Sequence, residues 1–183
     1  MATARVLNIA PPRPRAGALD LRGAIVLLVA AFLPLGAFGL VNLGAEALGI
    51  LPLFFAPFGL PGWMGAVAHL AQLCLLGAAF GLLPHERASR AARLWLLVLV
   101  GCYIALPFVT PPLDSLQLSL VCTTLFLVGL AALRRVGAAA PGAGWLMTPM
   151  LLVLGFSATM GLAIAAAYSP PFALMQGQQA PPA

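Results

Sequence analysis

The sequence predicts an all-α membrane protein, a bundle of five transmembrane helices. Of its 183 residues, 62% are hydrophobic and only 7% are charged. A soluble domain carries roughly a quarter charged residues, so this composition excludes an ordinary soluble globule. The mean hydropathy is +1.06. The apolar residues also form separate runs, and each is long enough, alone or with its flanks, to cross the roughly 30 Å hydrocarbon layer as a helix.

The first predicted span covers residues 23–43 and is broken only by Pro34. It follows a basic, proline-rich tail, residues 1–22, which we expect to be disordered. The second span covers 63–83. The stretch between them, 44–62, is apolar too, but Pro52, Pro57 and Pro61 prevent another continuous helix. We expect it to be a long loop at the outer membrane interface.

The remaining predicted spans cover residues 94–109, 116–133 and 145–167, joined by short loops. Residues 23–168 therefore form one five-helix transmembrane domain. The tail 169–183 has proline at both ends and little to bury, so we expect it to be disordered.

Basic residues predict the orientation of the chain. All nine are arginines, and with five spans they all fall on one side of the membrane: Arg5, Arg13, Arg15, Arg22, Arg87, Arg90, Arg93, Arg134 and Arg135. Loops rich in arginine stay in the cytoplasm, which places the N-terminus inside and the C-terminus outside. We expect a multi-pass protein of the bacterial inner membrane. Although the net charge is +5, no contiguous basic face exists, so we expect no nucleic-acid partner.

Polar side chains within the spans are the candidates for chemistry, because burying them in lipid is costly. They are Asn42, Glu46, His69, Gln72, Ser119, Thr123, Thr124, Thr148, Ser157 and Thr159. No carboxylate lies at membrane depth, and no catalytic triad, zinc-ligand pair or phosphate loop can be assembled from this set. The cysteines have no paired spacing. We therefore expect neither an enzyme nor a metal site.

His69 is the one titratable side chain near the middle of a span, and two interpretations remain open for it. A neutral imidazole can be the axial ligand of a haem or chlorophyll-type metal. It can also form an interhelical hydrogen bond to a serine, threonine or glutamine, which is the interpretation we favour. Small residues lie four positions apart in two spans, Gly77 with Gly81 and Ser157 with Gly161. Such pairs favour close helix packing or a dimer face.

The layout of five spans with a long proline-containing first loop resembles the TspO/MBR family of tryptophan-rich sensory proteins and translocator proteins. That family opens its second helix with a pattern close to P-x-W-x-P-P-x-W, followed by Trp, Tyr and Gly. In this sequence Pro61, Trp63 and Gly77 match, while Phe58, His69 and Leu73 stand for the family's Trp, Trp and Tyr.

Two later helices extend the resemblance over roughly residues 24–168. In the third span Pro107 and Phe108 match the family's Pro and Phe, but its Asn and Trp are missing. In the fifth span Pro149, Leu151 and Phe156 match, and Ser157 replaces a small Ala. Where the family has Tyr, Trp and Asn, this chain has Met150, Val153 and Gly161. Only three tryptophans remain.

The resemblance implies a divergent TspO-like protein that binds an apolar or tetrapyrrole-type ligand, with a sensory, regulatory or transport-related role. The expected pocket lies between the first, second and fifth helices under loop 44–62. The ligand-binding residues it implies are Phe58, Trp63, His69, Leu73, Phe156 and Ser157. Porphyrin propionates favour arginine or lysine partners, and every arginine is on the opposite side from that loop. A neutral ligand, such as a sterol-like or isoprenoid molecule, is therefore easier to accommodate.

Other classes of function stay open beside this one. The chain could be a non-catalytic accessory subunit of a larger membrane complex, because its spans carry almost no charge and their surface is rich in Ala, Gly and Leu. It could also bind pigment through His69. We expect membrane lipids, a hydrophobic small molecule, and either a second copy or a larger complex as its partners, and no cofactor other than a porphyrin or related tetrapyrrole.

Overall fold

The computed structural model describes residues 21–56, 60–84 and 89–168. They form helices α1 (Leu21–Ala47), α2 (Gly62–Leu82), α3 (Arg90–Val109), α4 (Ser115–Ala139) and α5 (Pro141–Tyr168), with no strand among the described residues. All five helices are long and apolar enough to cross a membrane. The predicted fold class is confirmed, and the chain is a multi-pass helical membrane protein.

Four helices are longer than the sequence analysis expects, and one of them is α3, which begins at Arg90 and not at residue 94. α1 continues to Ala47, so Glu46 lies in the helix and not in a loop. α4 continues to Ala139 and includes both Arg134 and Arg135, because alanine and arginine favour helix beyond the apolar run. α5 begins at Pro141, a position where the missing N–H of proline costs nothing. The predicted tails lie outside the described residues apart from Leu21 and Arg22, which begin α1.

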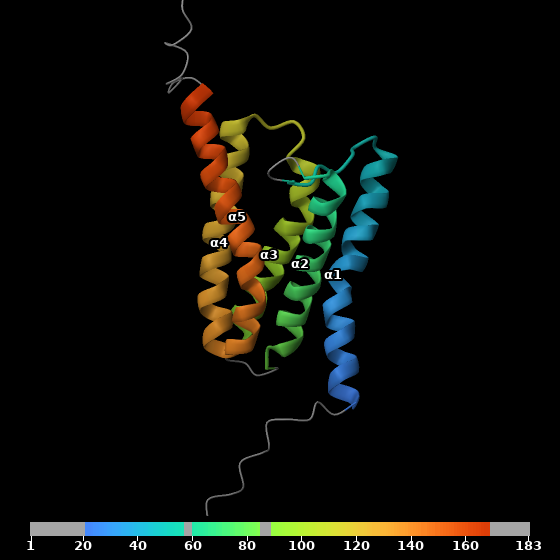
Figure 1. Cartoon of the computed structure of the whole chain (residues 1–183). Coiled ribbons are helices and arrows are strands. Elements are labelled where there is room, and N and C mark those ends of the chain that lie inside the picture. Colours follow the sequence, from blue (N-terminus) through green and yellow to red (C-terminus); the bar gives the residue numbers. More distant parts are fainter. Residues whose placement is uncertain (1–20, 57–59, 85–88, 169–183) are drawn as a thin grey trace, which may run out of the picture.

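Four of the helices form a ring. α2 contacts α5, α5 contacts α4, α4 contacts α3, and α3 closes the ring on α2. α1 packs outside this ring against α2 and α3, and Figure 1 shows it at the edge of the molecule. Few of its side chains are buried, Phe38 among them, so most of its surface faces outward. α1 therefore packs against the outside of a four-helix bundle formed by α2, α3, α4 and α5.

Glycine brings α1 and α2 into backbone contact. A Cβ atom on Gly77 would lie 2.3 Å from the carbonyl oxygen of Ala30, and one on Gly81 would lie 2.9 Å from the Ala30 Cβ. Pro34 follows Ala30 by four residues and has no N–H to donate to that carbonyl. The freed oxygen lies against the α2 backbone at Gly77, where it can accept weak Cα–H hydrogen bonds.

α4 and α5 pack by the same means. A Cβ on Gly161 of α5 would lie 2.8 Å from Ser119 Cβ, and one on Gly129 of α4 would lie 2.5 Å from the Leu151 side chain. Lipid provides no hydrophobic force between helices, so association depends on close contacts of this kind. The small residues that suggested a dimer face thus make contacts within the chain.

Backbone groups left free by a proline or by the start of a helix find hydrogen-bond partners in nearby side chains. Pro149 in α5 cannot donate to the carbonyl of Trp145, and the Thr148 hydroxyl donates to that oxygen instead, at 2.6 Å. At the start of α4 the Asp114 carboxylate accepts from the backbone N–H of Gln117, whose side chain in turn accepts from the Asp114 N–H. This capping box fixes the N-terminus of α4.

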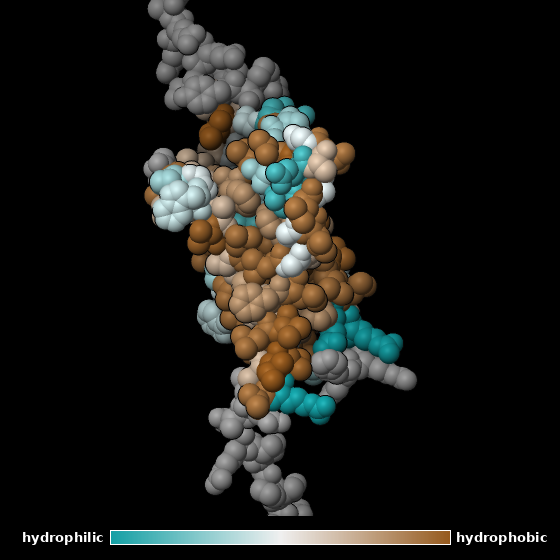
Figure 2. Space-filling model, turned by 90° about the vertical axis from the view of Figure 1, so that its right-hand side faces the viewer, coloured by the Kyte–Doolittle hydropathy of each residue, from teal (hydrophilic) through white to brown (hydrophobic). Residues whose placement is uncertain are grey.

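The up-and-down course of the helices separates the charges. The described arginines, Arg22, Arg90, Arg93, Arg134 and Arg135, gather at one end, which we call the arginine end. Glu46, segment 48–56 and Asp114 lie at the opposite end, the loop end. Figure 2 shows a hydrophobic belt between hydrophilic ends. This separation supports the predicted orientation.

Two of these arginines also make contacts that join elements. The Arg93 side chain donates to the carbonyl oxygen of Leu83 at 2.8 Å and ties the start of α3 to the end of α2. The Arg135 guanidinium lies 4.6 Å from the ring centroid of Trp95, a cation–π contact between α4 and α3. Trp63 and Trp145 are 65% and 76% exposed near opposite ends of the bundle, as expected of tryptophans in the two interfaces of a bilayer.

The orientation can be measured with single cysteines. In a variant whose native cysteines are replaced by alanine, we expect Glu46→Cys to react with a membrane-impermeant maleimide added outside intact cells. Arg90→Cys, at the arginine end, should react only after the cells are opened. The reverse pattern of labelling would contradict the positive-inside argument.

The contact between α1 and α2 can be tested at Gly77. Gly77→Ala places a methyl group against the rigid backbone of α1, and such overpacking costs typically 1–3 kcal/mol. We expect a lower unfolding temperature in detergent. Gly36→Ala is the matched control, since nothing lies within 4 Å of a Cβ there. Equal unfolding temperatures for the two variants would show that the close approach at Gly77 does not stabilise the fold.

Candidate functional site

A cavity of about 300 Å³ lies inside the helical ring, in the half nearest the loop end. Ligand pockets in proteins typically range from roughly 300 to 1,000 Å³, so this cavity is at the small end of that range. Its lining is mainly apolar and includes no charged residue. The lining comes from segment 53–56, from α2 between Gly65 and Gln72, from α3 between Tyr103 and Thr110, from α4 between Ser115 and Cys122, and from α5 between Val153 and Ile164.

Segment 53–56 reaches the cavity because it is held against α2 and α3 at the loop end of the bundle. The backbone N–H of Leu53 donates to the carbonyl oxygen of Pro107, in the last turn of α3, at 2.8 Å. On the other side, the Phe55 carbonyl oxygen lies 2.5 Å from where a Cβ on Gly65 would be. Glycine at position 65 therefore lets the loop rest directly on α2, and Phe54 and Phe55 line the cavity.

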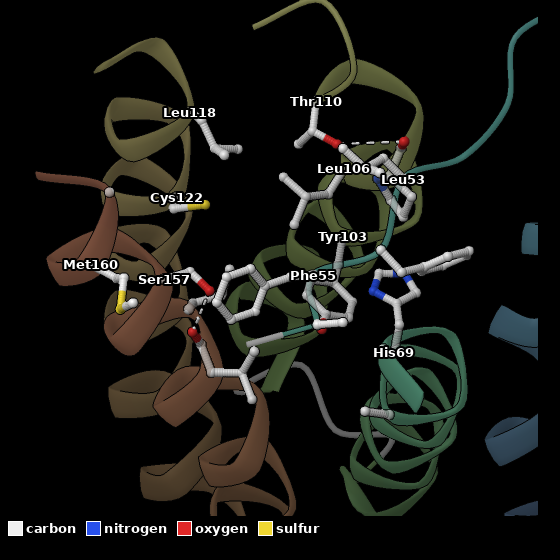
Figure 3. Close-up of a pocket in the computed structure, with 18 of the residues that line it drawn as sticks. Leu53, Phe55, His69, Tyr103, Leu106, Thr110, Leu118, Cys122, Ser157 and Met160 are labelled. Atoms are coloured by element: carbon white, nitrogen blue, oxygen red, sulfur yellow. Dashed lines mark hydrogen bonds between the residues drawn. The ribbon is translucent and has the colours of Figure 1, made fainter. Parts of the chain in front are cut away.

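His69 of α2 is the central polar group of the site. It is 7% exposed, and its ring is stacked on Tyr103 with centroids 4.3 Å apart and an interplanar angle of 20°. Phe54 packs edge-on against it at 5.5 Å, and Phe38 of α1 lies at 5.8 Å. Its Nε2 atom has no hydrogen-bond partner among the described residues. Figure 3 shows His69 across the cavity from Ser157 and Met160 of α5.

Tyr103 is itself fixed by a hydrogen bond between helices. Its hydroxyl donates to the Oε1 atom of Gln72, which lies three residues after His69 and on the same face of α2. Both side chains are buried. The bond joins α3 to α2 beside the cavity and holds the tyrosine ring against the imidazole.

The hydroxyl groups in the spans are satisfied within their own helices. Each donates to a carbonyl oxygen three or four residues earlier, as Ser157 does to Val153 at 2.8 Å and Thr123 to Ser119 at 2.7 Å. The same holds for Ser119, Thr124, Thr148 and Thr159. This is the usual way for serine and threonine to satisfy their hydrogen bonds within a helix. Their protons are therefore donated within their own helices, and no hydrogen bond joins any of them to the Nε2 atom of His69.

The predicted ligand-binding residues are only partly brought together. His69 and Ser157 line the cavity. Leu73 is fully buried in the core and does not line it. Phe156 is 37% exposed, with its ring 6.3 Å from that of Phe55, and Trp63 lies at the surface. Phe58 lies outside the described residues.

Two expectations need correction. The pocket was expected between the first, second and fifth helices, but α1 contributes no residue to the cavity. The reason is that Phe38 and Phe108, with ring centroids 5.6 Å apart, fill the space between α1 and α3. The favoured hydrogen bond from His69 to a serine, threonine or glutamine is also missing for Nε2, since the Gln72 Oε1 atom accepts from Tyr103 and the hydroxyls donate to their own helices.

Tyr103 and the pair Phe54–Phe55 are site residues that the sequence reasoning missed. A signal for Tyr103 was present, since a tyrosine in mid-span needs a partner for its hydroxyl and His69 and Gln72 share one helix face. No comparable signal marked the two phenylalanines, whose position depends on the loop contacts at Gly65 and Pro107.

Comparison with known proteins found no matching family, no similar curated protein and no similar solved structure. Among the described residues no group of three or more His, Cys, Asp or Glu side chains could hold a metal ion. The arrangement is a small, uncharged cavity with one unpartnered imidazole nitrogen.

The Tyr103–Gln72 bond can be measured by a double-mutant cycle. Tyr103→Phe and Gln72→Leu each leave one buried polar group unpaired, which costs about 1–3 kcal/mol in unfolding free energy. The double variant should lose less than the sum, with a coupling of about 0.5–2 kcal/mol, as for other hydrogen bonds between membrane helices. Additive losses in an unfolding titration would contradict the contribution of this bond to the fold.

Proposed function

We propose that this chain is a TspO-like membrane protein that holds a small neutral ligand in the cavity at its loop end, with a sensory, regulatory or transport-related role. The observation that carries the proposal is the uncharged, mainly apolar cavity with the buried imidazole of His69 in its lining. Apolar cavities with a few polar groups converging on them are the usual form of small-molecule sites.

The position of the arginines supports a neutral ligand over an anionic one. All described arginines are at the arginine end, and the cavity lies toward the loop end. A dicarboxylate such as free-acid protoporphyrin would find no cationic partner in the described lining and would have to bring its charge into an apolar site.

A porphyrin comparison tests the neutrality of the ligand. We expect purified protein to bind protoporphyrin IX dimethyl ester at least as tightly as the free acid, as measured by porphyrin fluorescence anisotropy in the same detergent. A strong preference for the free acid would overturn the proposal that the site selects neutral molecules, because it would require a cationic contact in the site.

Filling the cavity tests its location. Ser157→Leu adds bulk to the cavity wall, and we expect it to weaken binding of the ester by tenfold or more. Thr159→Leu, two residues further along α5 at an exposed position, is the matched control and should bind normally. Equal effects of the two substitutions would place the binding elsewhere. If no saturable binding occurs in wild-type protein and a stoichiometric partner co-purifies, the chain is an accessory subunit instead.

A further inference from the structure

His69 carries the one buried side-chain nitrogen of the described cavity lining that has no hydrogen-bond partner. The other such atom in the described part of the chain is Arg93 Nε, at the arginine end and away from the cavity. Leaving a buried polar atom unpaired destabilises a fold, and such an atom in a native structure calls for an explanation. Nε2 itself has almost no accessible surface, so a molecule in the cavity reaches His69 at another part of the imidazole ring.

The imidazole is held in a fixed position. Tyr103 stacks on one face of it, Phe54 meets it edge-on, and Phe38 packs from α1. The bond between Tyr103 and Gln72 keeps the tyrosine ring in place. A rigid polar group presented in an apolar site loses little entropy when a ligand binds, which favours specific recognition.

The rest of the cavity offers little for a second polar group. The hydroxyl of Ser157 is engaged with its own helix, and α5 contributes mainly apolar side chains, including Val153, Met160 and Ile164. The lining residues of α5 run from Val153 to Ile164, twelve residues that cover roughly 16 Å along the helix axis. About 300 Å³ spread over this length is a narrow space, which suits one chain better than a broad ring system.

We propose that the cavity takes a linear isoprenoid-type molecule ending in a hydroxyl or carbonyl oxygen, and that this oxygen hydrogen-bonds the imidazole of His69 where the ring lines the cavity. This inference rests on the proposed function and specifies the ligand of the same site. A neutral imidazole has one N–H donor and one acceptor nitrogen, so it can bind either kind of oxygen. Because the Tyr103 hydroxyl and the Gln72 Oε1 atom bind one another, His69 is the lining residue with an acceptor nitrogen for a ligand hydroxyl.

Farnesol and farnesene test the inference, because they share a skeleton and differ in the hydroxyl group. We expect radiolabelled farnesol to bind wild-type protein saturably, and unlabelled farnesene to compete about tenfold or more less well. His69→Phe keeps an aromatic ring against Tyr103 and removes the nitrogen. In this variant farnesol and farnesene should bind equally. Without ligand, its unfolding temperature should match or exceed that of wild type, because no polar atom is then left buried and unpaired.

Ring ¹⁵N NMR gives a second readout, which follows the histidine itself. The chain has two histidines, and the His69 signals are those that disappear in His69→Phe. Farnesol should shift the ring nitrogen resonances of His69 and farnesene should not, while His85 serves as the reference in the same sample. Unchanged His69 signals at saturating farnesol would overturn the inference.

The outcomes separate this inference from the proposed function. If neither farnesol nor farnesene binds saturably and the porphyrin ester does not bind either, the proposed function fails. If farnesol and farnesene bind wild-type protein equally, or if His69→Phe keeps the preference for farnesol, only the role of His69 fails. A coloured preparation that His69→Ala bleaches would overturn the isoprenoid assignment in favour of a metal tetrapyrrole.

Discussion

Close contact between helix backbones at glycine is the constraint on which the rest of this structure depends. In a bilayer, apolar side chains gain nothing by leaving lipid for another helix, so helices associate through packing contacts and hydrogen bonds. Gly77 and Gly81 bring α1 onto α2, and Gly129 and Gly161 bring α4 onto α5. Gly65 then lets the loop rest on α2 in the same way. Gly65 and Gly161 also line the cavity, so these close contacts help to form its wall.

The polar groups of the bundle follow a second rule, that each finds a partner as near as possible. Serine and threonine hydroxyls return to their own helices, and Thr148 takes over the carbonyl that Pro149 leaves free. Tyr103 and Gln72 satisfy one another between helices. Against this background the unpartnered Nε2 atom of His69 is exceptional, and it belongs to a residue that lines the cavity. A polar atom left without a partner inside a packed protein is the feature that most clearly separates a site from ordinary packing.

The helices could be predicted from the sequence because long apolar runs leave few alternatives in lipid. The pocket walls could not, because they depend on which helices touch, and that is decided by side chains interlocking at positions such as Gly77 and Phe38. His69 was identifiable as the lone titratable group in mid-span. Its environment was not, since the partners that seemed available, Gln72 among them, are engaged elsewhere.

The cavity and the arginines occupy opposite halves of the bundle, which has a consequence for exchange with the membrane. If the arginine end faces the cytoplasm, a molecule that reaches the cavity from the bilayer comes from the outer leaflet alone. Occupancy then reports the composition of that leaflet and not the total content of the membrane. A lipid made on the cytoplasmic side would have to cross the bilayer before this protein could bind it, so transbilayer movement would set the rate at which the site fills.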